Sequence, residues 1–145
     1  MFLDSVEPYI TDLLNGFNVT AFAYGATSAG KTFSIFGPHN SPGLLSLSIQ
    51  HIYNIVERKY RGRDYKITFS LVEIFNENLR DLLLLNEQAS AGIEVFSQNP
   101  ALEVRDDPVK GIKVAGIKEI TAFGPDQIIS TVRSALKQRV KESTN

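Results

Sequence analysis

At 145 residues the chain is long enough for one domain with its own hydrophobic core and too short for two ordinary domains. Its 15 Lys and Arg are balanced by 16 Asp and Glu, which excludes the strong field that binding to nucleic acid or a membrane surface would use. The absence of cysteine excludes disulfides, and no apolar stretch approaches the roughly 20 residues that span a bilayer. We expect a soluble, intracellular protein with no nucleic-acid and no membrane partner.

The chain opens on a helical pattern that is followed by a strand pattern. Five apolar residues at helical spacing define one face of the helix: Val6, Ile10, Leu13, Leu14 and Phe17. Asn15-Gly16 supplies the stop, because these residues accept the backbone conformation that often follows a helix C-terminus. The apolar run 19–24 then predicts a β-strand of parallel type.

Residues 25–32 read GATSAGKT, a complete G-x-x-x-x-G-K-[ST] phosphate-binding loop placed directly after the predicted strand. In such a loop the backbone N–H groups point at an anion and the following helix adds its positive end. Lys31 would lie along the β- and γ-phosphates, and the Thr32 hydroxyl would bind Mg²⁺. The sequence therefore predicts a nucleoside triphosphate site.

The next segment is a helix in two halves. It runs from Lys31 to about Phe36, breaks at Gly37-Pro38 and again at 41–43, and resumes across 45–58. The sequence Arg58-Lys59-Tyr60-Arg61-Gly62-Arg63 is a basic turn, which we interpret as a solvated connection because short charged runs usually are.

The second half of the chain alternates strands and turns. A long strand is expected at 65–75 and a turn at 76–78; residues 79–85 are apolar, and 86–92 are expected to form a loop. Short strands are expected at 95–96, 102–104, 112–114 and 117–120. A last helix opens at 124–126, and its apolar face is formed by Ile128, Ile129, Val132, Leu136 and Val140.

Four stretches, in order, resemble the kinesin motor domain. Residues 6–18 are similar to the family's "V-x-P-L-V…V-L-x-G-Y-N" helix, and 22–27 to the "F-A-Y-G-x-T" that leads into its phosphate loop. Residues 71–83 resemble "E-I-Y-N-E…D-L-L", and 102–116 resemble "L-x-V-R-E-D…G-V-x-V-x-G". A phosphate loop alone would indicate only an NTPase, whereas this ordered set points to kinesins.

The resemblance implies an α/β P-loop NTPase fold with the three-layer architecture of a kinesin motor, incomplete in this chain. Residues 1–145 would form a partial motor domain, from the first long helix through the helix that precedes switch I. Switch I, switch II and the main microtubule-binding face would then be absent. Two residues depart from the family pattern: Ser28 stands where Gly is frequent, and Ala135 where Gly is usual in the last helix.

The resemblance also implies the site residues and the cofactors, which are ATP and Mg²⁺. Thr32 would contact the metal, and Phe33 occupies a position that either packs near adenine or belongs to the core. Glu73 corresponds to a structural glutamate, and no catalytic residue is assigned. The nucleotide-binding residues would be Gly25, Ala26, Thr27, Ser28, Ala29, Gly30, Lys31, Thr32 and Phe33.

The partner that the resemblance implies is the microtubule, in the cytoplasm and cytoskeleton. Lys110 and Lys113 match a segment that makes a secondary contact there, and the alternative for both is a solvated surface lysine. The parent protein would be a homodimer, joined through a coiled coil outside this chain.

Three hypotheses for the function remain open at this point. The first is an ATP-dependent microtubule motor of which this chain is a fragment, inactive alone because the switches that act on the γ-phosphate are missing. The second is a non-catalytic nucleotide-binding or interaction remnant of a motor domain. The third, an unrelated small P-loop NTPase or kinase, lacks support from a Walker B aspartate or lid arginines. We further expect the isolated chain to be marginally stable or aggregation-prone.

Overall fold

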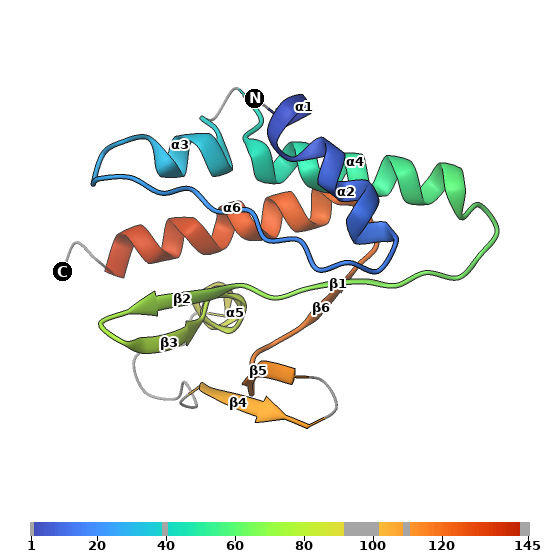
Figure 1. Ribbon diagram of the computed structural model, residues 1–145. Helices are drawn as coiled ribbons and strands as arrows, with labels where there is room; N and C mark the ends of the chain where they lie inside the picture. Colours follow the sequence, from blue (N-terminus) through green and yellow to red (C-terminus); the bar gives the residue numbers. More distant parts are fainter. Residues whose placement is uncertain (1, 39–40, 92–101, 109–110, 143–145) are drawn as a thin grey trace. The chain divides into compact units, whose positions relative to one another are not determined.

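The computed structural model describes residues 2–38, 41–91, 102–108 and 111–142. They fall into two compact units, Met1–Tyr65 and Lys66–Asn145, which are described separately. The first unit is helical, with α1 (Phe2–Ser5), α2 (Glu7–Leu14), α3 (Lys31–Phe36) and α4 (Leu44–Lys59). The described residues of the second unit form six strands and two helices, among them the long α6 (Pro125–Glu142) (Figure 1).

In the first unit, α1, α2 and α3 each contact α4. The face of α4 that carries Ile49, Tyr53 and Val56 is buried, as its helical spacing predicts. Burial raises the pKa of the Tyr53 phenol, and the charge of Tyr65 raises it further. The helices predicted here are confirmed, including the break between Phe36 and the start of α4. Phe17, which was expected on the apolar face of the first helix, lies beyond the end of α2 and is 66% exposed.

The strand predicted at 19–24 does not form. Residues 17–25 have no regular secondary structure and are drawn as a plain trace between α2 and α3 (Figure 1). Phe22 is 82% exposed and Tyr24 95% exposed. A strand requires a neighbour to complete its hydrogen-bond ladder, and no strand in the described part of the chain pairs with this segment. The segment therefore has the composition of a strand without the pairing that makes one.

In the described part of the second unit, the strands form three two-stranded antiparallel sheets. β1 (Ile67–Phe69) pairs with β6 (Ile120–Ala122), and β2 (Val72–Phe75) pairs with β3 (Asn78–Asp81). The strand predicted at 65–75 is thus divided where it changes partner, at Ser70-Leu71. The Leu71 carbonyl accepts a hydrogen bond from the Leu82 N–H at 3.0 Å, outside both ladders.

The β2–β3 hairpin lies where the sequence predicts a turn, at 76–78. Asn76 and Glu77 both have positive φ, at 47° and 63°, which is the backbone of a tight type I′ hairpin between β2 and β3. β4 (Glu103–Asp107) and β5 (Gly111–Ala115) form the other hairpin, with Arg105 opposite Lys113. The strand expected at 117–120 begins only at Ile120, and the one expected at 95–96 lies outside the described residues.

The helix α5 (Leu82–Ser90) occupies most of the segment that was predicted to be a loop at 86–92, so that prediction is wrong. The α5 helix packs against α6, and its Asn86 carboxamide oxygen accepts a hydrogen bond from Ser134 at 2.7 Å. Ala135 is 0% exposed and packs with Leu82 and Leu85, which explains why a small residue stands at this position of α6. Packing against α6 therefore extends α5 beyond its apolar first turns.

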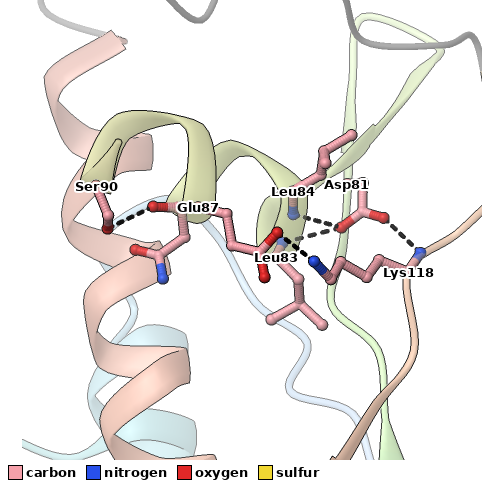
Figure 2. Close-up of polar contacts among 7 residues, drawn as sticks. Asp81, Leu83, Leu84, Glu87, Ser90 and Lys118 are labelled. Atoms are coloured by element: carbon pink, nitrogen blue, oxygen red, sulfur yellow. Dashed lines mark hydrogen bonds and ion pairs between the residues drawn. The ribbon is translucent and has the colours of Figure 1, made fainter. Parts of the chain in front are cut away.

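One carboxylate holds the start of α5 in place. Asp81 is 4% exposed, and its Oδ1 accepts hydrogen bonds from the N–H groups of Leu83 at 2.9 Å and Leu84 at 3.1 Å. Its Oδ2 accepts the Lys118 N–H at 2.6 Å, and the Lys118 ammonium in turn pairs with Glu87 (Figure 2). Asp81 thus caps α5 and ties it to the segment that leads into β6.

Candidate nucleotide-binding site

The residues of the phosphate-loop motif form a turn between the extended segment and α3. The Ala29 N–H donates to the Ala26 carbonyl at 3.2 Å, and the Ser34 N–H donates to the Gly30 carbonyl at 2.8 Å. Gly30 has a φ of 87°, in the left-handed region that L side chains seldom adopt, and it stands directly before α3. The second glycine of the motif is therefore required by the backbone itself.

Ser28 is the one residue of the loop other than glycine with a left-handed backbone, at a φ of 66°. A residue with a Cβ pays about 1–2 kcal/mol in this conformation, and glycine does not. This explains why glycine is a natural alternative at the position. The sequence pattern placed Ser28 in the loop without revealing its conformation.

Lys31 folds back over the loop. Its ammonium nitrogen donates to the carbonyl oxygens of Gly25 at 2.8 Å and Ala26 at 2.7 Å. An ammonium has three donors, so two bonds to the loop leave a third for another acceptor. Lys31 thus links the start of the motif, at Gly25, to its end, and its positive charge is held at the loop.

The first turn of α3 offers further donors. No side chain caps this helix, and the N–H groups of Lys31, Thr32 and Phe33 have no acceptor within a helix that starts at Lys31. Thr32 is exposed, so its hydroxyl is accessible to a metal ion at the loop. The donor set, which consists of backbone N–H groups, an ammonium and a hydroxyl, fits a magnesium-bound polyphosphate.

Phe33 is not part of the core, which was one of its two predicted roles. It is 65% exposed and lines a cavity of about 330 Å³ together with Phe2, Pro38 and Leu47. Its side chain is therefore available to a ligand bound near α3. The aromatic position is compatible with contact to a planar base, the alternative that the sequence left open.

The other residues singled out by the sequence belong to the second unit. Glu73 is half-buried and forms an ion pair with Arg80 across the β2–β3 hairpin, at 3.9 Å between Oε2 and Nη1. Lys113 is exposed and forms an ion pair with Asp107 across the β4–β5 hairpin. Lys110 lies outside the described residues.

The sequence patterns missed the role of Asp81. The available signal was an aspartate directly before Leu82-Leu83-Leu84-Leu85, which is a helix N-cap pattern. Among the described residues, no group of three or more His, Asp or Glu side chains could hold a metal ion, and no helix is both long and apolar enough to cross a bilayer.

A mixed fold of helices and strand pairs with a G-x-x-x-x-G-K-T loop at the start of a helix is typical of the phosphate-loop class of nucleotide-binding proteins. The profile of the kinesin motor domain matches residues 1–145. The chain belongs to the kinesin motor domain family.

Individual relatives agree with the profile. Kinesin-like protein KIN-8B of Arabidopsis thaliana is 34% identical over 140 residues, which are 97% of this chain and 16% of that protein. Kinesin-related protein 4 of Dictyostelium discoideum is 37% identical over 135 residues, which are 93% of this chain and 7% of that protein. The chain therefore spans less than a fifth of the length of either relative.

A solved structure shares the fold. It is described as a KIF14 dimer in a two-heads-bound state, with AMP-PNP and in complex with a microtubule. Its TM-score is 0.81 at 25% identity, and the match covers 95% of this chain and 36% of that one. The mixed helix and strand architecture is accordingly that of part of a kinesin motor domain.

Proposed function

We propose that residues 25–32 bind the phosphates of Mg·ATP, and that the chain is part of an ATP-dependent microtubule motor. Lys31 carries the proposal, because its ammonium is held at the loop by the Gly25 and Ala26 carbonyls. Membership in the kinesin motor domain family supports both parts of the proposal, and so does the likeness to a structure with AMP-PNP and a microtubule.

The loop backbone and the side chains of Lys31, Thr32 and Phe33 have different roles in this proposal. Backbone N–H groups of the loop and of the first turn of α3, together with the Lys31 ammonium, bind the phosphate oxygens. The Thr32 hydroxyl binds Mg²⁺, which neutralises charge on the β- and γ-phosphates when it is present. Phe33 lies one residue further along the exposed first turn of α3, where it contacts the adenine base.

The loop residues bind and orient the nucleotide, and hydrolysis requires more than binding. A group must position the attacking water, and others must stabilise charge on the transferred phosphoryl group. We assign neither role to a residue of this chain. We propose that the 145 residues assayed alone bind nucleotide with little turnover, and that turnover belongs to the whole motor.

The first prediction concerns Lys31. Replacing Lys31 with Ala removes a charge-assisted bond to phosphate, so the affinity for Mg·ATP falls about 10- to 100-fold. Titration with a fluorescent ATP analogue measures the change, and Lys137→Ala, which removes an exposed lysine of α6, is the matched control. Equal affinity of the Lys31→Ala and unmodified proteins would show that the loop is not the site.

Phosphate release separates the proposed motor from a non-catalytic remnant. Turnover that microtubules stimulate and that Lys31→Ala abolishes supports the motor. Tight nucleotide binding without turnover in the whole protein supports the remnant. Turnover by the 145 residues alone would contradict our assignment of the chain as a binding segment.

The second prediction concerns microtubule contact at the β4–β5 hairpin. The microtubule surface is strongly acidic, so exposed lysines are suitable contact residues, and Lys113 is exposed beside Asp107. Changing Lys110 and Lys113 together to Ala weakens co-sedimentation with microtubules a few-fold at low salt and leaves Mg·ATP affinity unchanged. Unaltered co-sedimentation would remove both lysines from the interface.

A further inference from the structure

The basic turn at 58–63 overlaps the end of α4, and hydrogen bonds fix its backbone. The Tyr60 N–H donates to the Val56 carbonyl at 2.9 Å, which is the last helical bond of α4. The Arg63 N–H then donates to the Tyr60 carbonyl at 2.9 Å, and Gly62 has a φ of 79°. The second bond closes a tight turn over residues 60–63, in which Arg61 and Arg63 flank Gly62.

The turn borders a cleft of about 560 Å³. Arg58, Arg61 and Arg63 line this cleft, together with Tyr60, Tyr65, Gly62 and one acidic residue, Glu57. The lining thus combines three arginines and two tyrosines with a single glutamate. Guanidinium groups bind carboxylates through two parallel hydrogen bonds, and tyrosine adds a donor and a flat apolar surface.

The positive charge of this segment is only partly balanced within the segment. Residues 57–65 hold four cations against the carboxylates of Glu57 and Asp64, in a chain whose net charge is −1. Arg58 donates from Nε to the Asn54 carbonyl at 3.3 Å. Across the residues that the structure describes, neither Arg61 nor Arg63 forms an ion pair.

Stabilisation of α4 explains only two of the four cations at 57–65. Arg58 and Lys59 lie in the last turn of the helix, where cations interact favourably with the exposed carbonyl groups. Arg61 and Arg63 lie beyond the helix end, where this effect has faded. Stabilisation of α4 therefore does not explain why Arg61 and Arg63 both line the cleft.

We propose that the cleft at 57–65 binds an acidic polypeptide segment with several neighbouring Glu or Asp side chains. The arginines are spread over six residues, from the last turn of α4 to Arg63, which matches a row of carboxylates better than one compact phosphate. The near-neutral chain as a whole lacks the extended positive field that a nucleic acid requires. Binding at this cleft is independent of nucleotide binding at the phosphate loop.

The test uses the purified protein and a short fluorescein-labelled polyglutamate peptide at low salt. Arg61→Gln/Arg63→Gln removes two cations of the cleft, and fluorescence anisotropy should show binding weakened about five- to tenfold. The control Arg133→Gln/Lys137→Gln removes two exposed cations of α6 and the same net charge, and it should bind like the unmodified protein. Mg·ATP affinity should be equal in all three proteins.

Three results would overturn the proposal. Equal weakening by both double variants would show unspecific attraction to net charge. Equal binding of a polyglutamine peptide would show that carboxylates are not recognised, and full displacement by equimolar tripolyphosphate would show a phosphate site instead. If the Arg61→Gln/Arg63→Gln protein is unfolded, Arg61→Lys/Arg63→Lys replaces it in the test. The lysines keep the positive charge but cannot form two parallel hydrogen bonds to a carboxylate, so affinity for the polyglutamate peptide should fall a few-fold. Unchanged affinity would then overturn the proposal.

Discussion

Asp81 shows how one residue can organise several elements of the second unit. Its two carboxylate oxygens accept three backbone N–H groups, two at the start of α5 and one at Lys118 (Figure 2). Lys118 is 37 positions further along the chain, so the carboxylate links segments that are distant in sequence. Because the residue is buried, water cannot replace these bonds when the carboxylate is removed.

Asp81→Ala should therefore lower the free energy of unfolding by about 2–4 kcal/mol, through loss of a helix cap and of acceptors for buried N–H groups. Denaturant unfolding followed by circular dichroism measures this. Asp106→Ala, at an exposed position of β4, is the control and should cost less than about 0.5 kcal/mol. Similar losses for the two variants would contradict the bridging role of Asp81.

At the scale of elements, the connection between α3 and α4 depends on close backbone contact. A side chain at Gly43 would collide with the Gly37 amide nitrogen and the Ile35 carbonyl oxygen. Gly43 itself has an ordinary extended backbone, with a φ of −82° and a ψ of 179°. The need for glycine at this position is steric, and it keeps the end of α3 against the start of α4.

Gly43→Ala should destabilise the first unit by about 1–3 kcal/mol, because the added methyl group forces the two backbones apart. It should also weaken Mg·ATP binding, since α3 begins at Lys31. Thermal unfolding and nucleotide titration measure the two effects. Gly124→Ala adds a methyl group into open space and serves as the control; matching behaviour of the two variants would rule out the collision.

At the scale of the whole molecule, the segment 17–24 is exposed and uncharged. Phe17, Val19, Phe22 and Tyr24 are all exposed, and no residue between 17 and 24 carries a charge. An unpaired apolar segment of this kind is a template for pairing with another chain. The exposed side chains make association with a second copy favourable.

The 145-residue chain should consequently associate as its concentration rises, as sedimentation velocity would detect. Phe22→Lys places a charge in the segment and should shift the chain toward monomer. Phe123→Lys, at a residue that is 89% exposed and outside the segment, should leave association unchanged. A stable monomer with a cooperative melt, before any substitution, would contradict this prediction.

The elements that the sequence determined by itself are those set by contacts within a few residues. The helices α4 and α6 follow from i, i+3 and i+4 apolar spacing, and the hairpin at Asn76-Glu77 follows from residues that tolerate positive φ. The phosphate-loop motif is likewise local, since its glycines and Lys31 lie within eight residues. These features need no distant partner, so composition and spacing suffice to predict them.

Only the tertiary structure decided the features that depend on distant partners. The segment 19–24 has the composition of a strand, yet no ladder partner stabilises it in the described part of the chain. The strand at 65–75 is divided because its halves pair with different strands, and α5 extends past Asn86 because α6 packs against it. Strand pairing and helix packing join residues far apart in sequence, and local patterns carry no information about whether the partner is in place.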